Sequence, residues 1–82
     1  MKQVLWSEPA LADLASLDKA TVRRIRQAVD RFADSNLGDV KWLQGVDPPA
    51  LRLRVGDYRV VFRQTAEVIR ITRVRHRREV YR

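Results

Sequence analysis

The most constraining feature of this sequence is a change in the spacing of its apolar residues near residue 51. Between Val22 and Ala33 the apolar side chains recur every three or four positions, a spacing that predicts an amphipathic helix. From Leu51 onward, "LRLRVGDYRVVFR" alternates apolar and basic residues around a Gly-Asp pair, which predicts a β-hairpin. A helical first half and a strand-rich second half predict an α+β fold.

The remaining segments complete the expected order β-α-α-β-β-β. The apolar start "KQVLW" predicts a first strand, and Ser7 and Asp18 are placed to cap two helices that form a hairpin. Glycines, prolines and Asx residues predict a loop over residues 35–50, with Trp42 anchoring it to the core. "VIRITRV" predicts the last strand. We therefore expect one domain over residues 1–82, a twisted antiparallel sheet packed against an N-terminal helical hairpin.

The last predicted strand contains a break in its alternation. Ile69 and Ile71 face one side, yet continued alternation would place Arg73 on that same apolar side. A β-bulge near Thr72 and Arg73 would remove the conflict, and so would an early end of the strand.

Basic residues are concentrated in the second half of the chain. Residues 1–41 hold seven Lys or Arg and six Asp or Glu, whereas residues 42–82 hold ten Arg and four Asp or Glu. Arginine binds phosphate oxygens bidentately, so a one-sided arginine-rich half points to nucleic acid or to an acidic protein partner. Charge alone does not distinguish these two partners.

The sequence lacks the residues that several classes of function require. It has no cysteine, one histidine and no carboxylate cluster spaced to hold Mg²⁺, so we expect neither a metal nor a cofactor. No apolar run approaches the roughly 18 residues that span a bilayer, and the first residues do not resemble a signal peptide. We therefore expect a cytoplasmic protein with no membrane partner.

The side chains left to carry chemistry suit one reaction. RNA cleavage through the 2′-hydroxyl needs a base, cations around the phosphate and an acid for the leaving oxygen, but no metal. Arg52, Arg54 and Arg59 lie in the predicted hairpin. The last ten residues, "RVRHRREVYR", add five arginines together with His76 and Tyr81. Nearby arginines favour the phenolate form of a tyrosine, which can then act as a base.

Each of these residues also has a plainer interpretation. Alternating arginines on a half-exposed strand are about as often merely solvated as functional. A lone histidine in a basic run is usually an exposed side chain, and Tyr81 could simply hold the tail in place. From the residues alone, a basic binding module is therefore the leading hypothesis, and a non-catalytic RNA-binding module is one form of it.

Three segments carry a resemblance to a known family. "LRLRVGDYRVVFR", "VIRITRVRHRREVYR" and "KWLQG" resemble toxins of the RelE/ParE superfamily from type II toxin–antitoxin systems, and the resemblance covers essentially the whole chain. It is closer to the RelE branch, whose members cut mRNA in the ribosomal A site. The resemblance implies the fold expected above and a ribosome-dependent, metal-independent mRNA endonuclease. It also implies contacts with ribosomal RNA and a heteromeric complex with an acidic antitoxin.

The resemblance also implies roles for individual positions. Tyr81 is implied as general base, and Arg59 as a phosphate clamp. Arg75 is implied to stabilise the transition state or to help protonate the leaving group. Arg52 stands where a catalytic lysine is found, and His76 stands in a region where some relatives use a histidine. The further residues expected to bind RNA are Arg54, Arg73, Arg77, Arg78 and Lys41.

A second function within the superfamily stays open. ParE-like toxins resemble this fold but poison DNA gyrase without cleaving RNA, and that branch generally lacks the tyrosine and arginine cluster. Arg59, Arg75 and Tyr81 together therefore favour the RNA-cleaving branch. Two departures oppose a full match: Ala50 stands where a basic residue is expected, and Arg52 is a poorer proton donor than lysine.

Overall fold

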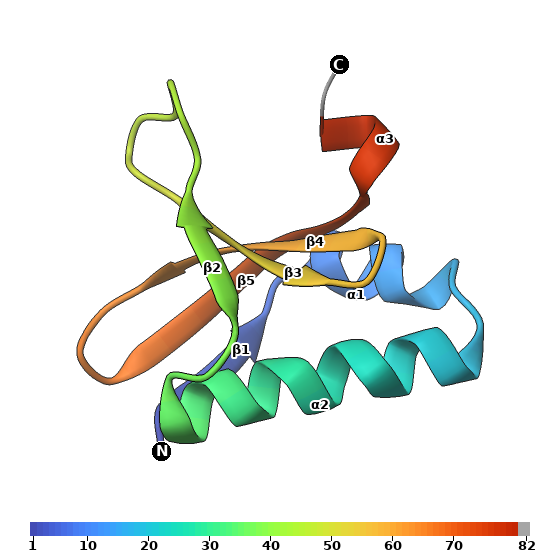
Figure 1. The fold of residues 1–82 in the computed structure, drawn as a ribbon, viewed down its shortest axis with the longest axis horizontal. Helices are drawn as coiled ribbons and strands as arrows, with labels where there is room; N and C mark the ends of the chain where they lie inside the picture. Colours follow the sequence, from blue (N-terminus) through green and yellow to red (C-terminus); the bar gives the residue numbers. More distant parts are fainter. Residues whose placement is uncertain (81–82) are drawn as a thin grey trace.

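The computed structural model describes the backbone of residues 1–80 and the side chains of residues 1–78. In Figure 1, α1 and α2 lie on one side of the sheet and α3 lies on the other. The fold class is α+β, as predicted. In chain order the elements are β1 (Gln3–Trp6), α1 (Glu8–Ala15), α2 (Lys19–Ser35), β2 (Asp39–Trp42), β3 (Leu51–Val55), β4 (Tyr58–Gln64), β5 (Val68–His76) and α3 (Arg77–Val80).

The five strands form one mixed sheet in the order β1-β5-β4-β3-β2. Strands β3, β4 and β5 form the predicted antiparallel meander. β1 pairs with β5 in parallel, with Gln3 opposite Val68, which corrects the expectation of a wholly antiparallel sheet. The two strands lie near opposite ends of the chain, so tertiary packing sets their direction and no short-range pattern reports it.

A short edge strand, β2, lies within the segment that we predicted to be a loop. It pairs antiparallel with β3, and Lys41 lies opposite Arg52. Trp42 is 65% exposed, so the prediction that it anchors this segment to the core is wrong. Gly38 precedes the strand, and a Cβ at this position would stand 2.7 Å from Cδ1 of Leu53. β2 therefore adds one strand to the predicted order, and glycine lets the chain enter it close to the core.

Side-chain caps begin both long helices, as predicted. Oγ of Ser7 accepts the backbone N–H of Ala10 at 3.1 Å, and the Asp18 carboxylate accepts that of Thr21 at 3.3 Å. Asn36, in the left-handed conformation with φ 58°, ends α2. The caps satisfy backbone groups that a helix terminus leaves unpaired. None of the helices in the described part of the chain is long and apolar enough to cross a bilayer.

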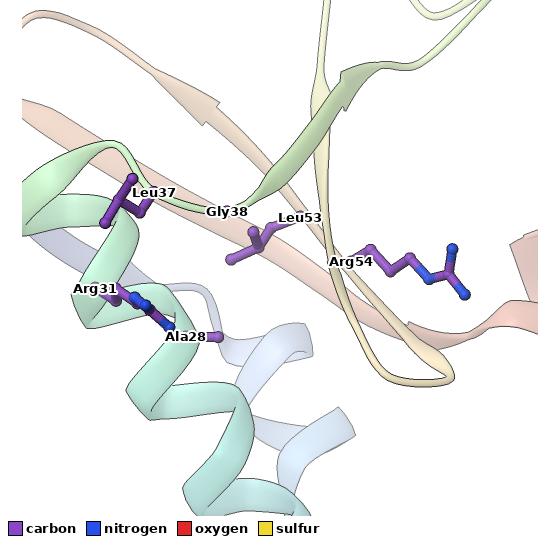
Figure 2. A pocket seen from close by; sticks show the side chains of 6 residues that line it. All are labelled: Ala28, Arg31, Leu37, Gly38, Leu53 and Arg54. Atoms are coloured by element: carbon purple, nitrogen blue, oxygen red, sulfur yellow. The ribbon is translucent and has the colours of Figure 1, made fainter.

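The apolar core lies between the helical hairpin and one face of the sheet. Strand side chains alternate between this face and the opposite one, which we call the outer face. Figure 2 shows the alternation on β3, where Leu53 points towards α2 and Arg54 points away from it. The buried core residues are Ala10, Leu14, Ile25, Val29, Phe32, Ala33, Leu51, Leu53, Val60, Phe62, Ile69, Ile71 and Val74.

A β-bulge at Thr72 interrupts the pairing of β4 with β5, which confirms one of the two sequence interpretations. Phe62 lies opposite Ile71 and Val61 lies opposite Arg73, so Thr72 is the extra residue between two paired positions. The other interpretation, an early end of the strand, is wrong because β5 continues to residue 76.

Candidate nucleic-acid interface

The bulge decides which tail residues reach the outer face. Val74 is 5% exposed and belongs to the core, so its neighbours Arg73 and Arg75 lie on the outer face. Without the extra residue, alternation would have turned these two arginines towards the core. The same shift returns His76 to the helix side of the sheet.

The sheet register brings three predicted site residues into one row across the outer face. Arg54 on β3 lies opposite Arg59 on β4, and Arg59 lies opposite Arg75 on β5. We call these three residues the arginine row. Like charges directly opposite one another destabilise an antiparallel pair. An anion bound at the arginine row would therefore relieve repulsion within the sheet.

Two further basic pairs lie along the same face. Lys41 lies opposite Arg52, and Arg63 lies opposite Arg70. Sequence reasoning named both residues of the first pair as site residues, without pairing them, and named neither residue of the second. The signal that could have found it is alternation, because Arg63 directly follows the buried Phe62 and must point to the other face.

Three arginines of the outer face have buried N–H groups with no hydrogen-bond partner among the described residues. These groups are Nη1 of Arg52, Nε of Arg59 and Nε of Arg63. Arg59 is only 5% exposed, and its Nη1 donates to the carbonyl of Tyr58 at 3.2 Å. A buried donor without an acceptor costs free energy, and the cost is larger for a charged group. The outer face therefore favours a ligand that brings negatively charged acceptors.

Arg73, expected to bind RNA, is instead bound by α1, which it reaches at the edge of β5 beyond Ile71, where the pairing with β1 has ended. Its Nε and Nη2 donate to the carboxylate of Asp13 at 2.8 and 3.0 Å, and the backbone N–H of Val74 donates to it at 2.8 Å. Partial burial raises the pKa of Asp13. The hydrogen bonds from Arg73 and Val74 and the charges of Arg73 and Arg75 outweigh that effect and lower this pKa below 3.8. Asp13, Arg73 and Val74 form what we call the clasp, which holds β5 directly after the bulge.

Ser7 holds the bulge at the junction of β1 and α1. Its backbone N–H donates to the carbonyl of Ile71 at 3.0 Å, and its Oγ donates to the carbonyl of Thr72 at 3.0 Å. On the other side, Oγ1 of Thr72 donates to the carbonyl of Val61 at 3.2 Å. Bonds from two neighbouring segments therefore fix the conformation that orients the end of β5.

His76 lies on the helix side of the sheet, away from the arginine row. Its ring contacts the ring of Tyr58 edge-on, with centroids 5.3 Å apart. Its Nδ1 accepts the backbone N–H of Arg78 at 3.3 Å, which places the proton of a neutral imidazole on Nε2. The structure thus brings together the predicted residues Arg59 and Arg75 but places His76 on the opposite face.

The tail continues from β5 into α3, beside the turn between β3 and β4. The backbone N–H of Arg77 donates to the carbonyl of Asp57 at 2.7 Å, and its Nε lies 3.9 Å from the carboxylate of the same residue. Arg78 is exposed. Tyr81, the predicted general base, lies outside the described residues.

Two hollows lie on the helix side of the sheet, and only one of them is bordered by a residue of the arginine row. One of about 360 Å³ lies between α2 and β3 and is bordered by Arg31, Leu53 and Arg54, but the guanidinium of Arg54 points away from it (Figure 2). The other, of about 650 Å³, lies along the α1–α2 hairpin and includes Leu14 and Val22. Within residues 1–78, no group of three His, Cys, Asp or Glu is placed to hold a metal ion. The candidate interface is therefore an open basic surface rather than an enclosed pocket.

A toxin family model matches nearly the whole chain. The model of the family described as ParE toxin of type II toxin-antitoxin system, parDE, matches residues 4–81. The chain therefore belongs to the ParE toxin family of type II toxin–antitoxin systems. No curated protein matches it.

Solved structures with the same fold include RelE complexes from two archaea. The chain is 29% identical to a chain of the RelE-RelB complex from Pyrococcus horikoshii OT3, with 93% and 94% of the two chains covered and a TM-score of 0.76. For the RelB-RelE antitoxin-toxin complex from Methanococcus jannaschii, the identity is 26%, the coverage 94% of each chain and the TM-score 0.74. YafQ from E. coli strain BL21(DE3) is 11% identical with full coverage of both chains and a TM-score of 0.78, which shows the fold alone. The resemblance to the RelE/ParE superfamily and the predicted fold class are confirmed.

Proposed function

We propose that this toxin cleaves mRNA on the ribosome, through the 2′-hydroxyl of the RNA and without a metal ion. The observation that carries the proposal is the set of buried, unpartnered N–H groups of Arg52 and Arg59 on a face that also holds Arg54 and Arg75. The guanidinium fork matches the geometry of phosphate oxygens. An RNA phosphate that reached these N–H groups as the side chains turned outward would supply the acceptors that they lack within the described residues.

The proposed reaction needs no atoms beyond the RNA and proton-transfer groups. A base takes the 2′ proton, the 2′ oxygen bonds to the adjacent phosphorus, the bond from phosphorus to O5′ breaks, and O5′ takes a proton. The products are a 2′,3′-cyclic phosphate and a 5′-hydroxyl. Arg59 and Arg75 lie opposite each other and would stabilise the charge that grows on the phosphate.

We assign a base to this reaction but no side-chain acid, so O5′ would take its proton from water. Tyr81 is the proposed base on the strength of the family resemblance. We assign no proton transfer to His76, because its ring faces Tyr58 on the other side of the sheet. Arg52 would contribute charge rather than a proton, because a guanidinium hardly deprotonates.

The proposed partners are mRNA, ribosomal RNA and an acidic antitoxin, in the cytoplasm. The net charge of +7 supports all three, and the two archaeal structures are complexes of RelE with RelB. The hollow along the α1–α2 hairpin supports an antitoxin helix with an apolar face, because Leu14, Leu17 and Val22 line it beside Arg23 and Arg26. Apolar burial would supply most of the affinity, and charge would supply speed and specificity.

Inhibition of DNA gyrase without RNA cleavage is the second candidate function. The match to the ParE toxin model favours it, since the resemblance implies gyrase as the target of that branch. The two candidates differ in the damage that cells show after the toxin is expressed, which is cut mRNA for the first and broken DNA for the second.

Expression from a tightly controlled promoter, followed by mapping of mRNA 5′ ends, tests the proposal. We expect new ends inside translated frames for the wild type and for Tyr58→Phe, and none for Tyr81→Phe. Growth arrest with intact mRNA and double-strand DNA breaks would support the gyrase function instead. If cells showed neither cut mRNA nor broken DNA, both candidates would be refuted and a basic binding protein would remain.

A further inference from the structure

The far end of the outer face holds a pair of arginines that the proposed reaction does not use. Arg63 on β4 lies directly opposite Arg70 on β5. On β4, Arg63 is four residues from Arg59 of the arginine row, which corresponds to about 13 Å along a strand. At this separation the pair is placed to contact a different phosphate of an extended strand from the one at the arginine row.

The guanidinium of Arg63 is held in place, yet one of its donors lacks a partner. Nη2 donates to the carbonyl of Pro48 at 3.3 Å, in the segment that precedes β3. Nε is buried and has no hydrogen-bond partner among the described residues. Because Pro48 already positions the guanidinium, an anion that binds at its exposed part would cost little additional side-chain freedom.

The surroundings of the pair also suit an anion. A cavity of about 70 Å³ has room for the oxygens of one phosphate. It is lined by Arg63, Gln64, Thr65, Val68 and Arg70. Within residues 1–78, no carboxylate forms an ion pair with either arginine of this pair. The clasp is different, because Asp13 already neutralises its arginine. Two like charges directly opposite each other, without a carboxylate partner, favour an external anion.

We propose that Arg63 and Arg70 form a second phosphate-binding site, which holds a phosphate of the RNA strand a few nucleotides away from the arginine row. This assignment rests on the proposed function, because it takes RNA as the ligand. The strand would run along β4 from Arg59 to Arg63. The second site would strengthen RNA binding and fix the position of the strand along β4, and it would not take part in cleavage.

Binding of uncleavable RNA to the full chain tests this site separately from cleavage. The probes are a long single-stranded 2′-O-methyl RNA and a 2′-O-methyl dinucleotide with a single phosphate. The test variant is Arg63→Gln/Arg70→Gln, and the matched control is Arg23→Gln/Arg31→Gln, which removes the same charge from α2. Arg63→Lys keeps the charge but removes the buried Nε, and thermal unfolding confirms that each variant is folded.

We expect the test variant to bind the long probe about tenfold more weakly than the control variant does. The dependence of log affinity on log salt should flatten by about 1.4 for two lost cations on a single strand. Affinity for the dinucleotide should not change, because the arginine row is intact. Arg63→Lys should lose part of the long-probe affinity.

Four results would overturn the site. Equal losses in the test and control variants would show a general charge effect. Loss of dinucleotide affinity would show that the pair acts at the arginine row. Tighter binding of the wild type to a single-stranded DNA of the same length and base sequence than to the long RNA probe would assign the phosphate to DNA. The probes cannot be cut, so the binding measurement does not depend on cleavage. If the wild type cleaves no RNA but binds the long probe tightly, and the test variant binds it more weakly, the site is supported and only the nuclease is refuted. A test variant that retains wild-type binding but cuts RNA would refute only the site.

Discussion

Replacing Asp13 with asparagine tests whether the clasp holds the bulged end of β5. The carboxylate accepts three hydrogen bonds, two from Arg73 and one from the backbone of Val74. The asparagine side chain would keep one acceptor oxygen but lose the charge and the bidentate geometry. We therefore expect Asp13→Asn to destabilise the fold at neutral pH.

The structure sets the expected size of this effect. A hydrogen bond to a charged group contributes about 1.5–3 kcal/mol. The side chain of Arg73 is 41% exposed, so water replaces part of what it loses, whereas that of Asp13 is 17% exposed. We expect a net loss of about 2 kcal/mol, which lowers the melting temperature of a domain of this size by about 10 °C.

The effect should depend on pH with a definite sign. The folded-state pKa of Asp13 lies below its ordinary value of 3.8, so the ionised carboxylate stabilises the folded state. This contribution is fully present above the unfolded-state pKa and is lost as the pH falls through the lowered folded-state pKa. The difference in free energy of unfolding between wild type and Asp13→Asn, which we call the gap, should therefore be constant above about pH 5. It should shrink towards zero in more acidic solution.

Urea unfolding followed by circular dichroism, over a pH series, measures the gap. Asp30→Asn is the matched control, because Asp30 is an exposed carboxylate on α2 without an ion pair among the described residues. Equal midpoints for the two variants at neutral pH would refute the clasp. So would a gap between wild type and Asp13→Asn that persists unchanged in acid.

Three further predictions concern other parts of the fold and the site. Ser7→Ala removes a helix cap and a bond to the bulge, so we expect a loss of about 1–2 kcal/mol in urea unfolding, and an unchanged midpoint would contradict this. Gly38→Ala places a Cβ 2.7 Å from Leu53, so it should cost about 1–3 kcal/mol, and wild-type stability would show that the entry to β2 is not tightly packed. Arg59→Lys should slow RNA cleavage about 10²–10³-fold relative to Arg31→Lys, and equal rates would exclude Arg59 as the phosphate clamp.

The sequence reports those parts of the fold that depend on local chemistry. Ser7 and Asp18 could be identified as caps because a cap acts within three residues of its own position. The bulge at Thr72 could be inferred because alternation fails there. β2 could not, since its four residues alternate polar and apolar but are too few, among nearby glycines and prolines, to distinguish a strand from a loop, and they pair because β3 lies beside them. The parallel pairing of β1 with β5 depends on residues more than sixty positions apart.

The candidate site was predicted in part for the same reasons. Alternation placed Arg52 and Arg54 on the outer face, and the same rule applied to β4 would have found Arg63. The hydrogen bond from Arg73 to Asp13 joins residues sixty positions apart, so no local sequence pattern predicts it. The orientation of His76 follows from the bulge, and only the register resolves it.

The most direct test of the proposed nuclease is cleavage of a defined mRNA on programmed ribosomes by the purified toxin. Two matched messages would be compared, one all-ribose and one with a single 2′-deoxy nucleotide immediately 5′ of the mapped cut. We predict that the first yields a 2′,3′-cyclic phosphate and a 5′-hydroxyl at the cut, with the metal chelator EDTA absent or present at a level that leaves the ribosomes intact. The second should stay whole at that position. Cleavage of the deoxy message at the same rate, or ends bearing a 5′-phosphate, would contradict the proposed chemistry.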